Sequence, residues 1–120
     1  MKGTVDEAHR ALLDVPVRSM KQQAFVPLTV WIDTAFNGSL VVPRDAIERL
    51  GLRATSTTEA ILADGTTIEL ETFACKLEWF GSVFRIQVIA SDSRLRLLGT
   101  SLLAGRRLII DYASGEVTLD

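Results

Sequence analysis

The chain has 120 residues, of which 48% are hydrophobic and 23% are charged, and its formal net charge is −2. This length and composition are typical of one folded globular unit, so we expect residues 1–120 to form a single domain and exclude a disordered chain. The nearly balanced charge provides no basic field for nucleic acid or for an anionic membrane surface, and we expect neither as a partner.

Two strands are predicted in the N-terminal part of the chain. The segment ALLDVPV at residues 11–17 alternates apolar and polar residues, and its Pro16 indicates an edge strand. A polar turn, KQQ, leads into a second apolar strand at residues 25–32. Residues 4–12 begin either as a strand or as a short helix, because TVDE at residues 4–7 matches the capping box that opens a helix.

The clearest helix signal lies at residues 43–51. Pro43 suits a first helical position, and Asp45 would lie in the electropositive first turn. Ile47 and Leu50 repeat on one face, and Gly51 is typical of the residue that ends a helix. The segment is therefore predicted to form a helix of about two turns.

Residues 60–90 are predicted to form two hairpins. Asp64 and Gly65 are a two-residue turn signal between apolar flanks, and Gly81 marks a second turn. The apolar residues before Glu71 occupy one phase of the alternation and those after it occupy the other. Since a slip of one residue exchanges the two faces of a strand, we expect a bulge or bend near Glu71.

The C-terminal part continues the same pattern. Residues 95–99 (LRLLG) are predicted as a short strand and residues 100–105 (TSLLAG) as a helical turn, and a last hairpin turns around Ser114 and Gly115. The predicted fold class is therefore all-β with one or two short helices.

The composition also limits the chemistry. Cys75 and His9 are the only residues of their types, which excludes an intrachain disulfide and argues against a His/Cys metal centre, so we expect neither metal nor cofactor. The N-terminal decapeptide is polar, unlike a signal peptide, and no apolar run approaches the roughly 20 residues that span a bilayer. We therefore expect a cytoplasmic protein.

Four segments occur in a recognisable order: WIDTAFNGSLVVP (residues 31–43), ILADGTTIEL (61–70), LRLLGTSLL (95–103) and LIIDYASGEVTL (108–119). In this order they resemble the retropepsin-like (clan AA) aspartic peptidases, and most of all the small single-domain prokaryotic type. The resemblance runs from about residue 3 to residue 119. It implies an acid-protease half-barrel that works as a homodimer on peptide or protein substrates in extended form.

The resemblance also assigns roles to the residues after the second strand. Asp33 would be catalytic, and it would pair with Asp33 of a second copy, because the chain has only one Asp-Thr motif. Thr34 would lock the two active-site loops together, and Phe36, Asn37 and Gly38 would contact the substrate. Phe36 could equally serve as a staple within the loop, and Asn37 and Gly38 are more typical of turn formers than of ligands.

Other segments receive roles in the same way. Ala63, Asp64 and Gly65 would form the tip of a flap over the substrate, although Asp64 could be a turn former alone. Residues 97–99 would pack beside the active-site loop. Residues 116–119 would contribute the strand that interleaves at the dimer interface.

Two carboxylates suit this chemistry. Hydrolysis of a peptide bond without a metal, a Cys or a His needs a base for water and an acid for the carbonyl oxygen or leaving nitrogen. Two carboxyl groups that share one proton can fill both roles, as they do in aspartic proteases. Asp33 could otherwise be an ordinary turn residue after a strand.

Ala35 departs from the Asp-Thr/Ser-Gly motif of these enzymes. If the backbone needs a positive φ at this position, alanine costs about 1–2 kcal/mol relative to glycine, whereas at negative φ its methyl group costs little. The methyl group could also crowd the substrate. A catalytically silent dimerisation or peptide-binding module with the same fold is therefore an alternative function.

A DNA-binding protein is a further alternative. Residues 39–52 (SLVVPRDAIERLGL) are similar to the strand–Pro–helix unit of swapped-hairpin bacterial antitoxins and regulators. Against this, residues 53–60 have little strand character, and 13 basic residues face 15 acidic ones. Without a basic surface, DNA binding would lack its main source of affinity.

Overall fold

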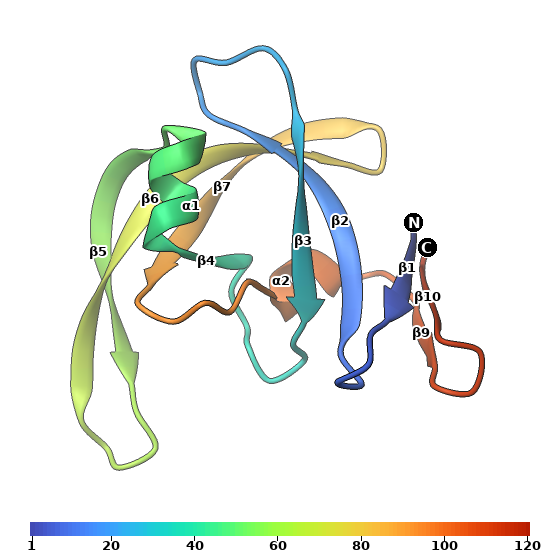
Figure 1. Ribbon diagram of the computed structural model, residues 1–120. Coiled ribbons are helices and arrows are strands. Elements are labelled where there is room, and N and C mark those ends of the chain that lie inside the picture. The colour runs from blue at the N-terminus through green and yellow to red at the C-terminus, as the bar shows by residue number, and fades with distance from the viewer.

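A computed structural model describes all 120 residues, and it contains one ten-stranded sheet with two short helices (Figure 1). The spatial order of the strands is β5-β6-β7-β4-β8-β3-β2-β1-β10-β9, and β6 also pairs with β2, so the sheet curls back on itself. The strands are β1 (Lys2–Val5), β2 (Ala11–Arg18), β3 (Val26–Ile32), β4 (Leu40–Pro43), β5 (Arg53–Ile61), β6 (Thr67–Trp79), β7 (Ser82–Ser91), β8 (Leu97–Leu98), β9 (Leu108–Asp111) and β10 (Glu116–Leu119). The helices are α1 (Arg44–Leu50) and α2 (Thr100–Leu103), so the predicted all-β class is confirmed.

The core lies inside the curl of the sheet. It is a cluster of 19 buried residues in which Leu13, Val30, Leu40, Leu77 and Leu98 are among the most buried. In β2 and from Cys75 to Trp79 of β6, buried residues alternate with exposed or half-buried ones, as expected for strands with one face against a core. The burial of apolar area on this face is the main force that holds the curl closed.

The N-terminal segment is a strand, which decides between the two interpretations of residues 4–12. β1 pairs with β2 on one side and with β10 on the other. The Asp6 carboxylate accepts hydrogen bonds from the backbone N–H groups of Ala8 and Arg10, so it stabilises a turn instead of capping a helix.

The prediction that Pro16 marks an edge strand is wrong for β2 as a whole, although the outer side of β2 has no partner at Pro16 itself. β2 lies between β3 and β1, and Pro16 is directly opposite Pro27 of β3. Because neither proline has an N–H group, this is a non-hydrogen-bonded pair, and both backbone nitrogens point away from the ladder that β2 and β3 share. On the outer side of β2, pairing with β1 ends at Leu12 and pairing with β6 begins at Val17, so Pro16 removes no sheet hydrogen bond there.

The predicted helix is confirmed, with a start one residue later. Pro43 ends β4 and is the N-cap of α1 in an extended conformation, while Gly51 ends the helix with φ of 67°. Ala46 and Ile47 face the core. The expectation that residues 53–60 have little strand character is wrong, because these Thr-rich residues form most of β5 against β6.

Both predicted hairpins are present, but their details differ. Phe80 and Gly81 form the two-residue turn between β6 and β7. The β5–β6 turn has three residues instead of two, since Leu62 N–H bonds Thr66 O across it and Gly65 takes a φ of 87°. The register shift lies in β5, between Ala54 and Ser56, opposite Thr72 and Phe73, so the slip predicted at Glu71 falls on the neighbouring strand.

The C-terminal strands pair within the chain. β10 lies between β1 and β9, so residues 116–119, which were expected to interleave with a second copy, already have a neighbour on each side. The free edge at this end of the sheet belongs to β9. Neither helix is long enough and apolar enough to cross a membrane.

Candidate active site

Asp33 stands directly after β3, where the backbone holds it firmly. β3 pairs in parallel with β8 through Trp31 and Ile32, and the Asp33 N–H donates to Leu98 O at 2.9 Å. The Asp33 carboxylate accepts a hydrogen bond from Ala35 N–H at 2.9 Å, and Phe36 N–H donates to Asp33 O at 3.2 Å. Asp33 is half-buried and forms no ion pair within the chain.

The Asp33 loop (residues 33–39) is bound to the start of α2 on its other side. β8 lies between β3 and β4 and pairs with both. After β8, Gly99 N–H donates to Ser39 O at 2.9 Å and Thr100 N–H donates to Phe36 O at 2.8 Å. These backbone bonds leave the loop little freedom, so the strand pattern of the sequence positions the carboxylate before any ligand is bound.

Phe36 and two glycines complete the packing of the loop. A Cβ atom on Gly38 would lie 2.4 Å from Cζ of Phe36, and one on Gly99 would lie 2.2 Å from the carbonyl oxygen of Gly38 and 2.6 Å from Cδ2 of Phe36. Gly99 has φ of −101°, so it is required here for space and not for an unusual backbone conformation. Phe36 thus packs within the loop, as a staple would, and it also lines the cleft described below, as a substrate contact would, so both roles that the sequence left open stay predictions.

Thr34 and Ala35 differ in what surrounds them. Thr34 is exposed, and its hydroxyl forms no hydrogen bond within the chain, so it is free to bond another molecule. Positive φ angles among non-glycine residues occur only at His9 and Phe80, so Ala35 has an ordinary backbone conformation. The strain that the missing motif glycine could have caused is therefore not present.

A cleft of about 1230 Å³ separates the Asp33 loop from the β5–β6 hairpin. Figure 1 shows the loop between β3 and β4 and this hairpin projecting toward the same side of the molecule. Ten of the 20 lining residues are hydrophobic. A cleft of this kind suits an apolar ligand with polar anchoring at one end, and Asp33 lies on its wall.

The structure brings together five of the predicted site residues and leaves four outside the cleft. Those that line it are Asp33, Ala35, Phe36, Asn37 and Gly38. Thr34 and the three turn residues Ala63, Asp64 and Gly65 do not line it in a single chain. The hairpin instead contributes its middle section, residues 58–61 and 68–70.

The hairpin tip is held by its own turn chemistry. The Asp64 carboxylate accepts hydrogen bonds from Thr66 Oγ1 at 2.7 Å and from Thr66 N–H at 3.0 Å. These two bonds lower the pKa of Asp64, the side-chain bond most. Ile61, next to the turn, is 79% exposed, so the tip presents apolar surface to its surroundings.

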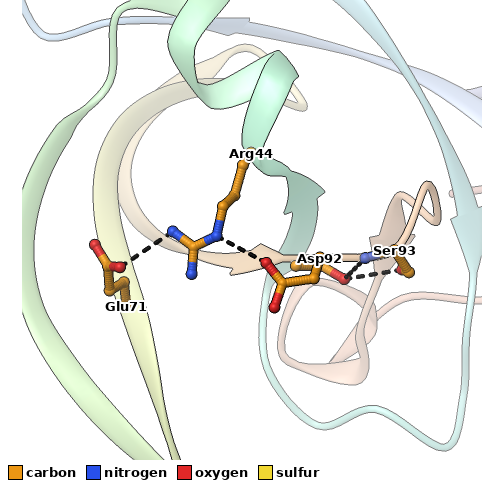
Figure 2. Close-up of polar contacts among 5 residues, drawn as sticks. Arg44, Glu71, Asp92 and Ser93 are labelled. Atoms are coloured by element: carbon orange, nitrogen blue, oxygen red, sulfur yellow. Dashed lines mark hydrogen bonds and ion pairs between the residues drawn. The ribbon is translucent and has the colours of Figure 1, made fainter.

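Sequence reasoning missed several residues of the cleft. Val41, Ile89 and Leu97 line it as neighbours on three paired strands. Arg44 lines it too, and its guanidinium bonds both Glu71 and Asp92 (Figure 2). Leu97 lies in residues 97–99, which the resemblance already placed beside the active-site loop. No local signal indicated Val41 or Ile89, and none links Arg44 to partners 27 and 48 residues away.

Two alternative kinds of chemistry find no support in the structure. No group of three or more His, Cys, Asp or Glu residues is placed to hold a metal ion. Cys75 is buried in the core cluster, and burial raises the pKa of its thiol to about 12. A thiol in this state is an inert core residue and not a nucleophile.

Known structures share this architecture, although no protein-family model and no curated protein matches the sequence. A retropepsin-like aspartic protease from Rickettsia conorii aligns over 99% of this chain and 88% of its own, with 16% identity and a TM-score of 0.64. The EIAV protease, in complex with an inhibitor, aligns over 83% of this chain and 90% of its own, with 19% identity and a TM-score of 0.59. The retroviral protease-like domain of Ddi1 from Leishmania major aligns over 91% and 88%, with 17% identity and a TM-score of 0.50. The chain therefore has a retropepsin-like fold, and the expected resemblance is confirmed at the level of the fold.

Proposed function

We propose that this retropepsin-like chain is an aspartic endopeptidase whose catalytic site forms when two copies bring their Asp33 carboxylates together. The observation that supports this most directly is the position of Asp33. Backbone bonds to β8 hold the residue at the wall of a cleft whose lining is half hydrophobic. The fold does not need a charge at this position, because an uncharged turn residue such as Asn could accept the same hydrogen bond from Ala35 N–H.

The proposed chemistry needs two such carboxylates. Two charged groups about 3 Å apart repel each other by roughly 5 kcal/mol at an effective dielectric of about 20, so near neutral pH the pair keeps one proton. The ionised member takes a proton from a water molecule, and the protonated member donates to the carbonyl oxygen or to the leaving nitrogen. The pair titrates as a unit, and the pH–rate profile reports both macroscopic pKa values.

The substrate would lie extended in the cleft. Its backbone would bond the Asp33 loop on one side and the hairpin on the other, as an added strand does. Its apolar side chains would contact Val41, Ile89 and Leu97. In the dimer, the Thr34 hydroxyl would bond across the two-fold axis, and the hairpin tip with Asp64 and Gly65 would close over the substrate.

We place the second copy at the free edge of β9. This edge reads Leu-Ile-Ile-Asp, without the Lys or Pro that usually protects an exposed strand, and Ile109 is 45% exposed. Tyr112, just beyond it, is 63% exposed. Antiparallel pairing of β9 with β9 of a second copy is symmetric, as a two-fold dimer requires, and leaves the pairing of β10 intact.

The test compares wild type with Asp33→Asn on a proteome-derived peptide library between pH 3 and 7, with cleavage read by mass spectrometry. Asp45→Asn is the matched control, because it removes an exposed aspartate outside the cleft. We expect cleavage by wild type and by the control, and none by Asp33→Asn. If no Asp33-dependent cleavage occurs at any pH, and Ala35→Gly does not produce it, the peptidase proposal is wrong and the silent-module alternative is favoured.

Mixing tests the shared site. If each site needs both Asp33 residues, added Asp33→Asn protein should lower the activity of a fixed amount of wild type by forming inactive heterodimers. Ile109→Lys, on the β9 edge, should lower the dimer population in sedimentation and the activity together. Activity that is unchanged by the inactive variant would contradict a site shared between chains.

A further inference from the structure

The β5–β6 hairpin leaves the body of the sheet as a two-stranded ribbon. β6 pairs with β7 only from Thr72 to Trp79, and β5 pairs with no strand except β6. Residues 56–71 therefore have no third strand beside them. Because a two-stranded ribbon is only marginally stable by itself, its angle over the cleft depends on the contacts at its base.

One face of the base is held by a cluster of hydroxyl groups. Thr72 is only 5% exposed, and its Oγ1 donates to Ser56 O at 3.1 Å. Thr55 Oγ1, at the bulge of β5, lies 3.1 Å from Thr72 Oγ1 and donates to Gln87 Oε1 at 2.7 Å. This cluster joins β5, β6 and β7 where the ribbon begins.

The opposite face is held by Arg44. Glu71 is the neighbour of Thr72 in β6, so its side chain points to the other face of the ribbon. The Arg44 Nη1 donates to Glu71 Oε1 at 3.1 Å, and the Arg44 Nε donates to Asp92 Oδ1 at 2.9 Å, as Figure 2 shows. One guanidinium thus joins the ribbon to the loop that follows β7.

The two bonds of Arg44 have different geometries. Arg44 and Asp92 each follow a residue of the Pro43–Ser91 pair of β4 and β7, so the bond between them stays within the body. The bond to Glu71 is the one that crosses from the body to the ribbon. Asp92 therefore orients the guanidinium, and the hydrogen bonds to Asp92 and to Glu71 raise the pKa of Arg44, so it remains charged.

We propose that Arg44 is a positioning residue that sets the angle of the β5–β6 hairpin over the cleft, with its bond to Glu71 breaking when the hairpin lifts. The side chains of Arg44 and Glu71 are about half exposed and that of Asp92 is almost fully exposed, so the bond is weak and screened by salt. A weak bond suits a wall that must open for each substrate. The consequence for cleavage rests on the proposed function, whereas the effect on the hairpin does not.

The test is hydrogen exchange of the backbone amides in the full chain without substrate. Arg44→Gln and Glu71→Gln should each speed exchange in residues 56–70 by about twofold to fivefold, the range that an exposed ion pair supports. Asp92→Asn should have a smaller effect, and Arg44→Lys an intermediate one, since an ammonium lacks the fork that spans both carboxylates. High salt should bring wild type close to Arg44→Gln.

Arg49→Gln is the matched control, because Arg49 lies on the same helix and pairs only with Asp45. Its hairpin exchange should equal that of wild type, and amides of β2 and β3 should be unchanged in every variant. Equal hairpin exchange in wild type, Arg44→Gln and Glu71→Gln would overturn the proposal, and so would an equal increase in Arg49→Gln.

A kinetic measurement separates positioning from general destabilisation. If Arg44 positions the hairpin, Arg44→Gln should raise KM by about twofold to fivefold with a smaller change in kcat. A lower fraction of folded enzyme would instead lower kcat at constant KM, and that pattern would contradict the positioning role. If wild type cleaves nothing, the peptidase proposal fails, while the exchange result still decides the role of Arg44.

Discussion

The two walls of the cleft are built by different forces. The Asp33 loop is bonded through the backbone to β8 and to the start of α2, and Phe36 fills the space that Gly38 and Gly99 leave open. The hairpin wall is a ribbon with exposed apolar residues, held at its base by hydroxyl groups and one arginine. The carboxylate proposed for the chemistry therefore lies on the wall that the backbone holds firmly, and it faces a wall that fewer and weaker contacts hold.

The largest expected effect is the loss of stability when a buried side chain in the body of the sheet is shortened, compared with the same change in the ribbon. Leu98 is fully buried beside the Asp33 loop, so Leu98→Ala should lower the free energy of unfolding by about 2–5 kcal/mol. Ile61→Ala, in the exposed part of the ribbon, should change it by less than about 0.5 kcal/mol. Urea denaturation of both variants measures the contrast, and similar losses would show that the ribbon is part of the cooperative core.

A smaller effect tests how the fixed wall is packed. Gly38→Ala should cost about 1–3 kcal/mol, because its Cβ would meet the Phe36 ring. In a Phe36→Ala background this cost should largely disappear. Gly99→Ala should remain costly in the same background, because its Cβ also meets the backbone oxygen of Gly38 at 2.2 Å. Double-mutant cycles on thermal unfolding provide the measurement, and equal rescue of both glycines would contradict this packing.

The smallest effect uses Cys75 as a reporter of the body alone. Its folded pKa of about 12 lies above the ordinary value of 9.0, so its contribution to stability is complete below pH 9 and is lost as the pH rises toward 12. At pH 10 the unfolded chain has ionised its thiol and the folded chain has not, which lowers the free energy of unfolding by about 1.4 kcal/mol relative to pH 8.

Cys75→Ala removes this term and serves as the reference for all other groups that titrate in the same range. The difference between wild type and Cys75→Ala should therefore change by that amount between pH 8 and pH 10. Adding Arg44→Gln or Glu71→Gln to both proteins should not alter this pH-dependent difference in stability, since Cys75 pairs with Ile86 in the body of the sheet. A difference that does not depend on pH would show that the thiol is accessible in the folded chain.

Local signals predicted most of the fold. The alternation of residues 11–17, the Gly65 and Gly81 turns and the Gly51 helix end depend on neighbours in sequence, and all are present. The errors concern partners that are distant in sequence. The bulge appeared in β5 because register is set by both strands, and β5 itself formed because β6 pairs with its threonines.

The candidate site divides in the same way. Asp33 and the loop behind it follow from an apolar strand that ends in a carboxylate, and the predicted site residues of this loop other than Thr34 do line the cleft. Gly99 does pack against this loop, as the resemblance implied for residues 97–99. Arg44 and Ile89 belong to the site only through contacts across the sheet, which no spacing in the sequence encodes. The roles of Asp33, Thr34 and the hairpin tip in catalysis remain predictions.

The opposed prolines of β2 and β3 bear on how the chain avoids aggregation. Pro16 lies where the outer side of β2 has no partner, and Pro27 lies in β3 before its pairing with β8 begins at Trp31. At both places the missing N–H denies an incoming strand the donor that it would need for cross-β growth. Both stretches of unpaired strand therefore lack a donor at their centre, whereas the two edge strands of the sheet, β5 and β9, contain no proline and keep all their N–H groups.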